Sequence, residues 1–358
     1  MYKALFFIGF LFVLALTACS DAQVKQVIGN TLPASTGDID EVVLLIDEAL
    51  WKNAPGDSLR AILQRDFLIL PQSEPMFDLR TIYSMKGFGS MLQRSGVVLI
   101  VADMSNTGSD ITQAVQEQLN RFSEEGKPAP AFFARQNVWA TPQRVVYVQG
   151  SSAQDVAQLV SKNSIGLIKQ LYEIGNLKAY NNAYAAKVND GITATLAQKY
   201  KIEVQIPNMF QPAVEADNFI WLRADNQATE EVQNLMFYAE PYTTAPALTE
   251  ELAVALRNKM GKNVSTQIAG SYMAADTTLG FISNKVMLPS GNEALEVRGL
   301  WRMQGDFMGG PFVTYCINDP TNRRIVVADA FVYAPKIDKR RIVRRMERIV
   351  ETIKVGGL

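Results

Sequence analysis

The chain has 358 residues and a mass of 39.6 kDa, with 48% apolar and 20% charged residues, values typical of a globular protein rather than a disordered one. Lys and Arg together number 35 and Asp and Glu 36, so no bulk charge favours nucleic-acid binding. The sequence contains no histidine, which excludes Ser-His-Asp and Cys-His catalysis and zinc sites built from histidine.

The first 18 residues have the pattern of a secretory signal peptide. One lysine precedes an apolar run from Ala4 to Ala18, which is short for a membrane span and ends in small residues. The last residues of this pattern, LTAC, resemble a bacterial lipobox, in which the chain is cut before the cysteine and acyl chains such as palmitate are attached to it. We therefore expect signal peptide 1–18, lipidation at Cys19 and a membrane-anchored location in the cell envelope.

The segment that follows the lipobox is polar and aperiodic, so residues 19–36 are predicted to form a lipidated tether. Cys316 is then the one cysteine left, which rules out an intramolecular disulfide. It lies in the strand-like sequence PFVTYCIND, where a buried filler is favoured over a reactive thiol.

Residues 37–175 alternate between strand and helix patterns. Continuous apolar runs at 42–46 and 97–101 are typical of strands buried on both faces. Capped amphipathic stretches, including 56–67 and 111–122, predict helices between them. This alternation predicts an α/β layered half.

Residues 153–199 are predicted to be largely helical, with a break near Gly175. Tyr180 and Tyr184 begin a stripe at helical spacing, which we interpret as core packing rather than a ligand platform. The long helix is the predicted junction between the two halves.

Residues 176–358 are richer in strand patterns, interrupted by helices near 249–261 and at the C-terminus. We expect a mainly antiparallel sheet flanked by helices, which makes the whole chain α+β. The sequence leaves open whether 37–175 and 176–358 fold separately or as one compact domain. KIEVQIP, at 201–207, is among the predicted strands.

The C-terminal helix is amphipathic, with an apolar stripe and six basic residues around it. Its basic face admits two interpretations: contact with anionic lipid headgroups, or exposure to solvent while the apolar stripe packs on the sheet. The width of the stripe and the lack of Trp or Phe favour the second.

The sequence RGLWRMQGDFMGGPF holds the main candidate site, on a predicted β-hairpin over residues 294–318. Gly305 and Asp306 form a turn signal, and Gly309 and Gly310 are expected to adopt positive φ with a bulge. Strand alternation places Trp301 on the core face and the polar residues on the other face. The candidate ligand-binding residues are Arg298, Trp301, Gly309 and Gly310.

An enzyme without histidine would have to use carboxylates, for which Glu296 and Asp306 are the candidates. Phosphate-loop, dinucleotide-binding and nucleophile-elbow motifs are absent from the sequence, and no carboxylate spacing supports a metal site. We therefore expect no cofactor and no metal, and favour a protein that is not an enzyme.

Several motifs in combination resemble an uncharacterised family of Bacteroidota lipoproteins, domain of unknown function 4837. They are EPMFDL, VWATPQRVVYVQ, GSYM, VVADAFVYAP and the candidate-site sequence, and the resemblance extends from about residue 37 to the C-terminus. It implies an envelope location and transfers no activity or site residue.

The sequence thus favours a non-catalytic, lipid-anchored protein of the cell envelope that binds an envelope protein or glycan. Two alternatives remain: a carboxylate-based hydrolase acting on glycan, with Glu296 or Asp306 as acid or base and Arg298 as a charge clamp, and a structural assembly subunit.

Overall fold

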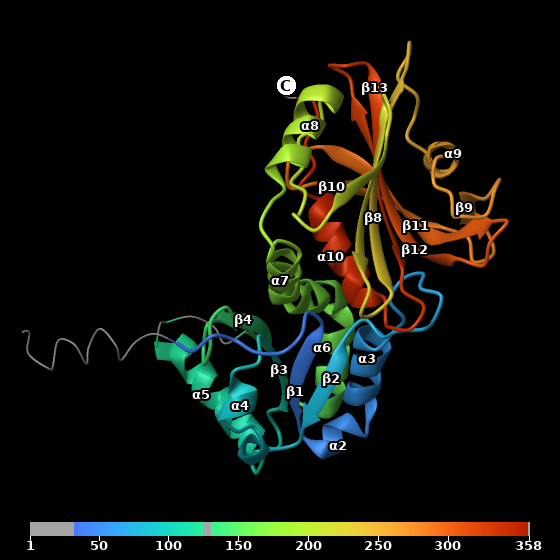
Figure 1. Cartoon of the computed structure of the whole chain (residues 1–358). Coiled ribbons are helices and arrows are strands. Elements are labelled where there is room, and N and C mark those ends of the chain that lie inside the picture. The colour runs from blue at the N-terminus through green and yellow to red at the C-terminus, as the bar shows by residue number, and fades with distance from the viewer. Residues whose placement is uncertain (1–31, 125, 127–129, 357–358) are drawn as a thin grey trace, which may run out of the picture.

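The computed structural model describes residues 32–124, 126 and 130–356, and in this part the chain forms two sheets, one in each half (Figure 1). The predicted fold class is confirmed: the N-terminal half is layered α/β, and the C-terminal half has an antiparallel sheet flanked by helices. The predicted signal peptide, Cys19 and the first part of the tether lie outside the described residues.

The N-terminal sheet has the strand order β2-β1-β3-β5-β4, and only β4 runs antiparallel to its neighbour. Its strands are β1 (Glu41–Ile46), β2 (Asp78–Ile82), β3 (Val97–Asp103), β4 (Phe132–Gln136) and β5 (Arg144–Gly150). Alternate residues of β1 enter different cores, with Leu44 on one face of the sheet and Leu45 on the other. The continuous apolar run at 42–46 therefore indicated a doubly covered strand correctly.

Helices cover both faces of this sheet. They are α2 (Glu48–Trp51), α3 (Ala54–Leu63), the short helix η1 (Met85–Gly87), α4 (Ser90–Gln93), α5 (Asp110–Glu124), α6 (Ala153–Lys162) and α7 (Ser164–Ala183). Apolar residues of α3, α6 and α7 line one core, and those of α4 and α5 line the other. Ser152 caps α6, since its hydroxyl accepts a hydrogen bond from the Asp155 amide at 3.2 Å.

The predicted helix break near Gly175 is wrong, because α7 continues through that residue. A Cβ at Gly175 would lie 2.3 Å from the carbonyl oxygen of Ile39, so the glycine allows α7 to approach the start of β1 closely. The helix breaks occur instead at Asn163 and between α7 and α8 (Asp190–Tyr200).

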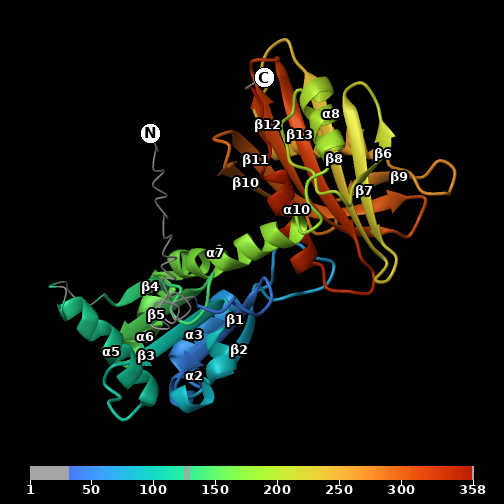
Figure 2. The same ribbon diagram turned by 60° about the vertical axis from the view of Figure 1, so that its left-hand side comes forward.

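The C-terminal sheet is antiparallel, with the order β10-β11-β12-β13-β8-β7-β6, and β9 pairs with the far end of β11 (Figure 2). Its strands are β6 (Gln211–Glu215), β7 (Phe219–Asn226), β8 (Glu231–Pro241), β9 (Tyr272–Asp276), β10 (Ile282–Met287), β11 (Glu293–Gln304), β12 (Gly309–Asp319) and β13 (Arg324–Tyr333). Helices α8 and α10 (Arg340–Val350) cover one face, and α9 (Glu250–Gly261) covers the other.

The strand predicted at KIEVQIP does not form, because this segment makes only isolated bridges between Val188 and Pro207 and between Glu203 and Lys354. Its apolar side chains are nevertheless buried against α8 and the sheet, which explains the misleading alternation. Burial on one side produces the same period as a strand, even where no neighbouring strand supplies hydrogen bonds.

Helix α10 joins the two halves. Its apolar stripe packs on the C-terminal sheet, as predicted, with Ile342, Met346 and Ile349 buried. Two residues of its basic face do not lie in solvent: Arg340 and Arg344 are 4% and 3% exposed and face the N-terminal half. Both interpretations of that face, lipid contact and solvation, are therefore wrong for these two arginines.

Candidate functional site

The predicted hairpin is present. Strands β11 and β12 pair in one uninterrupted register from Ala294 opposite Ile317 to Arg302 opposite Gly309, and residues 305–308 close the turn. The positive φ expected at Gly309 and Gly310 occurs instead at Gly305, where φ is +84°. No bulge interrupts this pair of strands, so that part of the prediction is wrong.

Gly309 and Gly310 are strand residues at a close backbone approach. A Cβ at Gly310 would lie 2.0 Å from the carbonyl oxygen of Val332 and 3.2 Å from Nε1 of Trp301. At Gly309 it would lie 2.9 Å from the carbonyl oxygen of Trp301. The two glycines are therefore explained by packing between neighbouring strands.

Trp301 packs in the core, as the alternation of β11 predicts, and is 3% exposed. Its Nε1 donates to the carbonyl oxygen of Val332 at 3.2 Å, and its ring meets Phe331 edge to face with centroids 5.3 Å apart. With its polar atom satisfied inside the protein, Trp301 forms part of a rigid wall rather than an open stacking platform.

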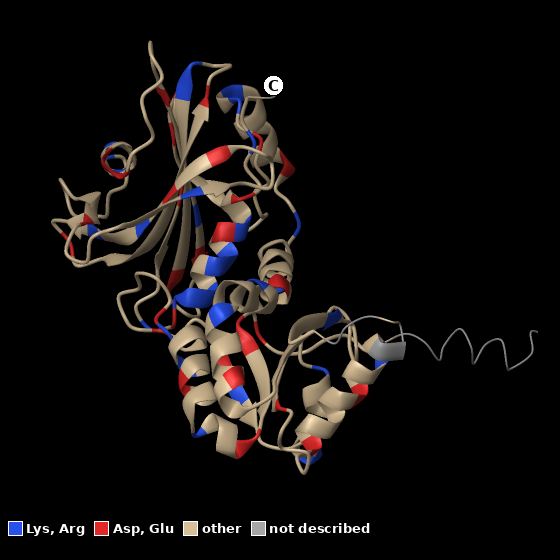
Figure 3. Cartoon of the chain, turned by 180° about the vertical axis from the view of Figure 1, so that it is seen from behind, with Lys and Arg blue, Asp and Glu red and all other residues tan. Residues whose placement is uncertain are grey.

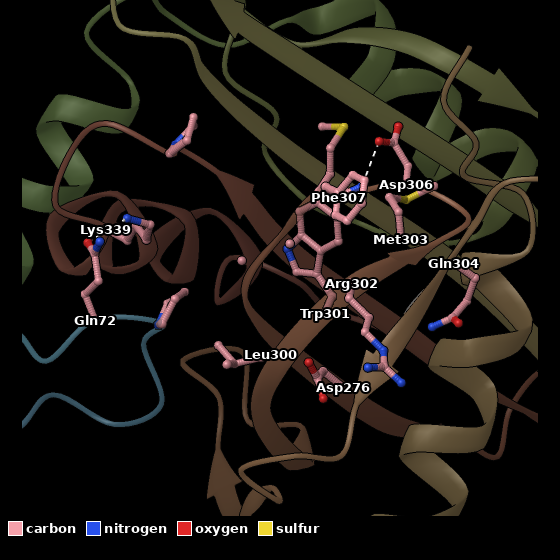
Figure 4. Close-up of a pocket in the computed structure, with 15 residues that line it drawn as sticks. Gln72, Asp276, Leu300, Trp301, Arg302, Met303, Gln304, Asp306, Phe307 and Lys339 are labelled. Carbon is pink, nitrogen blue, oxygen red and sulfur yellow. Dashed lines mark hydrogen bonds between the residues drawn. The ribbon is translucent and has the colours of Figure 1, made fainter. Parts of the chain in front are cut away.

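The end of the hairpin borders an open cleft of about 680 Å³ (Figure 4). The cleft brings together four residues that the sequence singled out: Trp301, Asp306, Gly309 and Gly310. It also recruits two more residues of the hairpin, Arg302 and Phe307. Residues that sequence reasoning missed come from three other parts of the chain: Gln72, Asp276, Pro335 and Lys339. The volume is in the range usual for ligand sites.

The polar groups of this hairpin cleft are held in place by local hydrogen bonds. Asp276 accepts from the side chain and the amide of Thr278, at 2.5 and 2.9 Å, and these two bonds lower the pKa of the carboxyl. Lys339 is 4% exposed, and its Nζ donates to the carbonyl oxygen of Ile337 at 2.9 Å. An anionic and a cationic group therefore lie on the walls of one cleft, which suits polar recognition.

An aromatic side chain stands at the tip of the hairpin. Phe307 is fully exposed, with a relative accessible surface of 106%. The carboxylate of the neighbouring Asp306 accepts a hydrogen bond from the backbone amide of Phe307 at 2.7 Å. Two further apolar residues, Tyr272 and Ile268, are 42% and 50% exposed on the adjacent segment. That segment is adjacent because Tyr272 pairs with Gln304. We call these three residues the apolar tip.

The other two predicted site residues lie elsewhere. Arg298 donates from Nε and Nη2 to the two carboxylate oxygens of Glu296 at 2.8 and 3.0 Å, and it also pairs with Glu347 of α10. The hydroxyl of Tyr315 donates to Glu296 at 3.0 Å. Glu296, Arg298 and Glu347 line a separate cavity of about 270 Å³ at the junction of the halves, together with Arg344 and Arg348.

This placement separates the two candidate catalytic carboxylates. Gln304 is eight residue steps along the strand from Glu296, a distance of roughly 26 Å at about 3.3 Å per residue. Paired glycosidase carboxyls lie only about 5 to 9.5 Å apart, so Glu296 and Asp306 cannot act as a pair. Both oxygens of Glu296 are also occupied by protein donors.

Charged residues are dense where α10 reaches the N-terminal half (Figure 3).

Within the described ranges, no group of three or more His, Cys, Asp or Glu side chains is arranged to hold a metal ion. Among the same residues, no helix has both the length and the apolar character that a bilayer crossing requires.

Two family models match the chain. Residues 189–352 match Domain of unknown function (DUF4837), and residues 35–182 match Domain of unknown function (DUF8532). The resemblance to the first family is thus confirmed for the C-terminal half only. The N-terminal motifs EPMFDL and VWATPQRVVYVQ fall within the second model.

Solved structures share only remote similarity. The Ran-binding protein Mog1p of Saccharomyces cerevisiae is 11% identical over 43% of this chain and 90% of its own, with a TM-score of 0.29. LpqN of Mycobacterium tuberculosis, described as involved in cell envelope biogenesis, is 11% identical over 43% of this chain and 83% of its own, with a TM-score of 0.25. Human StAR-related lipid transfer protein 5 is 10% identical over 49% of this chain and 95% of its own, with a TM-score of 0.22.

No curated protein sequence matched the chain. Residues 35–182 and 189–352 are thus similar to two successive domains of unknown function, DUF8532 followed by DUF4837, and the second is the family that the C-terminal motifs resemble.

Proposed function

We propose that this protein is a lipid-anchored protein of the cell envelope that binds another envelope protein at the hairpin cleft and the apolar tip, without catalysis. The anchor rests on the lipobox pattern that ends at Cys19. The observation that carries the binding role is the full exposure of Phe307 beside a cleft of about 680 Å³.

An exposed aromatic residue beside fixed polar groups favours a protein partner. Aromatic side chains and arginine are enriched in the centres of protein interfaces and contribute a large share of their binding energy. Here Phe307 and Tyr272 supply apolar area, while Arg302 and Asp276 supply charge on the same surface. Exposed apolar residues on neighbouring segments, such as those of the apolar tip, are typical of interaction sites.

The hydrolase alternative receives less support. Its proposed acid or base, Glu296, is bound by Arg298 and Tyr315, and its partner Asp306 lies at the other end of the strand. A glycan partner and a structural subunit remain the competing roles, and the experiments below separate them from the proposal.

The anchor is tested by metabolic labelling with radioactive palmitate. We expect label on the wild-type chain and none on Cys19→Ala, together with loss of the variant from the membrane fraction. Ser20→Ala is the matched control and should keep its label. Equal labelling of the wild type and Cys19→Ala would contradict lipidation at this position.

The binding role is tested by placing a photo-reactive phenylalanine at position 307 in living cells. Ile165, on the surface of α7 and 84% exposed, is the control position. We expect a discrete adduct containing a second polypeptide from position 307 and none from position 165. An adduct that consists of glycan would replace the protein partner with a glycan, and adducts of equal yield from both positions would refute a specific surface.

A further inference from the structure

The two edges of the C-terminal sheet differ in how they are protected. Strand β6, at one edge, contains Pro212 and a register shift between Pro212 and Val214. Proline and bulges are common devices that prevent an edge strand from pairing with another chain. The β6 edge is therefore blocked to further strands.

Strand β10, at the opposite edge, has no bulge, and its one charged residue is Lys285. It pairs with β11 through six consecutive residues without a shift, from Ile282 opposite Arg298 to Met287 opposite Glu293. Its sequence, ISNKVM, has neither proline nor glycine. Among the described residues β10 pairs with β11 alone, which leaves its outer side available for hydrogen bonds with a further strand.

A largely apolar cavity of about 550 Å³ lies beside this edge. Met287 of β10, Leu295 of β11 and Leu248 of the loop before α9 contribute its apolar walls, and Lys285 and Glu293 are the charged residues beside it. Met287 is 63% exposed, although it borders the cavity. Lys285 and Met287 lie opposite Leu295 and Glu293 in the register, so both side chains are on the same face of the sheet as the cavity.

We propose that the β10 edge binds an extended peptide segment of a partner protein, which adds to the sheet as a further strand. Main-chain hydrogen bonds along β10 supply affinity, and apolar side chains at alternate positions of the peptide enter the cavity. An acidic side chain of the peptide lies beside Lys285, which is exposed on the face of the sheet that carries the cavity.

The charge of Lys285 argues against a second copy of this chain as the occupant. Two β10 strands that paired antiparallel near their centres would bring their Lys285 ammonium groups close together. Like charges on facing strands destabilise such a pair, whereas an acidic residue on a foreign strand stabilises it. The edge therefore selects an acidic, alternating segment.

This surface is separate from the hairpin cleft. Strand β10 covers residues 293–298 of β11, whereas β9 covers residues 300–304, next to the cleft. The inference goes beyond the proposed function and does not depend on it, because no residue of the apolar tip takes part.

The test uses the full-length chain in detergent and a fluorescent seven-residue peptide. The peptide has a central glutamate, leucine two residues away on either side, and serine elsewhere. We expect saturable binding by anisotropy, and slower amide hydrogen exchange confined to β10. A peptide methylated on alternate backbone nitrogens should bind about tenfold more weakly, because it cannot complete the strand hydrogen bonds.

The substitution Lys285→Glu reverses an exposed charge and leaves the core unchanged. We expect it to weaken binding about fivefold, and to strengthen binding of the matching peptide with a central lysine by a similar factor. Phe307→Asp is the control and should leave both affinities unchanged.

Three results would overturn the inference. The first is no saturation at peptide concentrations up to about 1 mM, the weakest affinity that a specific site should show. The second is equal binding of the methylated peptide. The third is self-association of the chain that Lys285→Glu changes, because that would make a second copy the occupant.

Discussion

Arg340 in α10 donates from Nε to a carboxylate oxygen of Asp40, just before β1, at 3.0 Å and across 300 residues of sequence. Arg344 pairs with the other oxygen of the same carboxylate. Asp40 is 1% exposed, so one buried carboxylate pairs with two buried arginines at the junction of the halves. Removing one member of such a cluster leaves an uncompensated buried charge.

Asp40→Asn should therefore lower the free energy of unfolding by about 3–5 kcal/mol, measured by urea denaturation. The control is Asp57→Asn, whose carboxylate pairs with Arg60 at 2.6 Å but is 73% exposed. An exposed pair of this kind contributes at most about 1 kcal/mol. Equal effects of the two substitutions would contradict a structural role for the Asp40 cluster.

The residue that directly follows helix α10, Glu351, should titrate near neutral pH. Burial, followed by the nearby Glu347 carboxylate, raises the pKa of Glu351 to about 7, although Arg348 acts in the opposite direction. Because the folded pKa is above the unfolded one, the folded state retains a proton that the unfolded state loses. The free energy of unfolding should fall as pH rises from about 4.5 to 7, by roughly 3 kcal/mol at most.

Glu351→Gln should remove this component, since the amide does not titrate. Urea denaturation of both proteins between pH 5 and 8 should show the variant gaining stability relative to the wild type as pH rises. A difference between the two that stays constant over this range would show that Glu351 does not couple folding to protons.

The fully buried pair Arg257 and Asp329 should behave as one unit. Their side chains are 0% exposed, and Nε of Arg257 donates to Asp329 at 3.0 Å inside the core under α9. Arg257→Met and Asp329→Ala should each cost about 3–5 kcal/mol, and the double variant less than their sum. The measurement is a double-mutant cycle of unfolding free energies, and strict additivity would show that the pair is not coupled.

Gly310→Ala distinguishes packing from ligand binding at a residue that the sequence proposed as a ligand contact. The added methyl group would lie 2.0 Å from the carbonyl oxygen of Val332, so we expect a loss of about 1–3 kcal/mol. Gly166→Ala, where the new Cβ meets only Phe132 at 3.9 Å, should leave stability unchanged or slightly raised. Stability measured by thermal unfolding should separate the two, and a fully stable Gly310→Ala protein would refute the packing explanation.

Local patterns predicted most of the secondary structure. The runs at 42–46 and 97–101 became β1 and β3, and the turn signal at Gly305 correctly located a hairpin, because these features depend on residues close in sequence. Strands β9 and β10 were missed, since their side chains are half exposed and carry little apolar alternation.

The candidate site was only half predictable. Trp301 and Asp306 do meet at the hairpin cleft, but Gln72 and Lys339 reach it from distant segments that no local pattern connects. The same limit explains α10: its basic residues looked solvated because their acidic partners, Asp40 and Asp78, lie more than 250 residues away.

The affinity for the partner recovered by cross-linking at position 307 tests the central claim most directly. Phe307→Asp should weaken binding by at least about tenfold, as loss of an aromatic anchor does, with unchanged thermal unfolding because the side chain is fully exposed. Ile165→Asp should keep the wild-type affinity. An affinity of Phe307→Asp within about twofold of the wild type, outside the range expected for an anchor residue, would contradict the apolar tip as the binding surface.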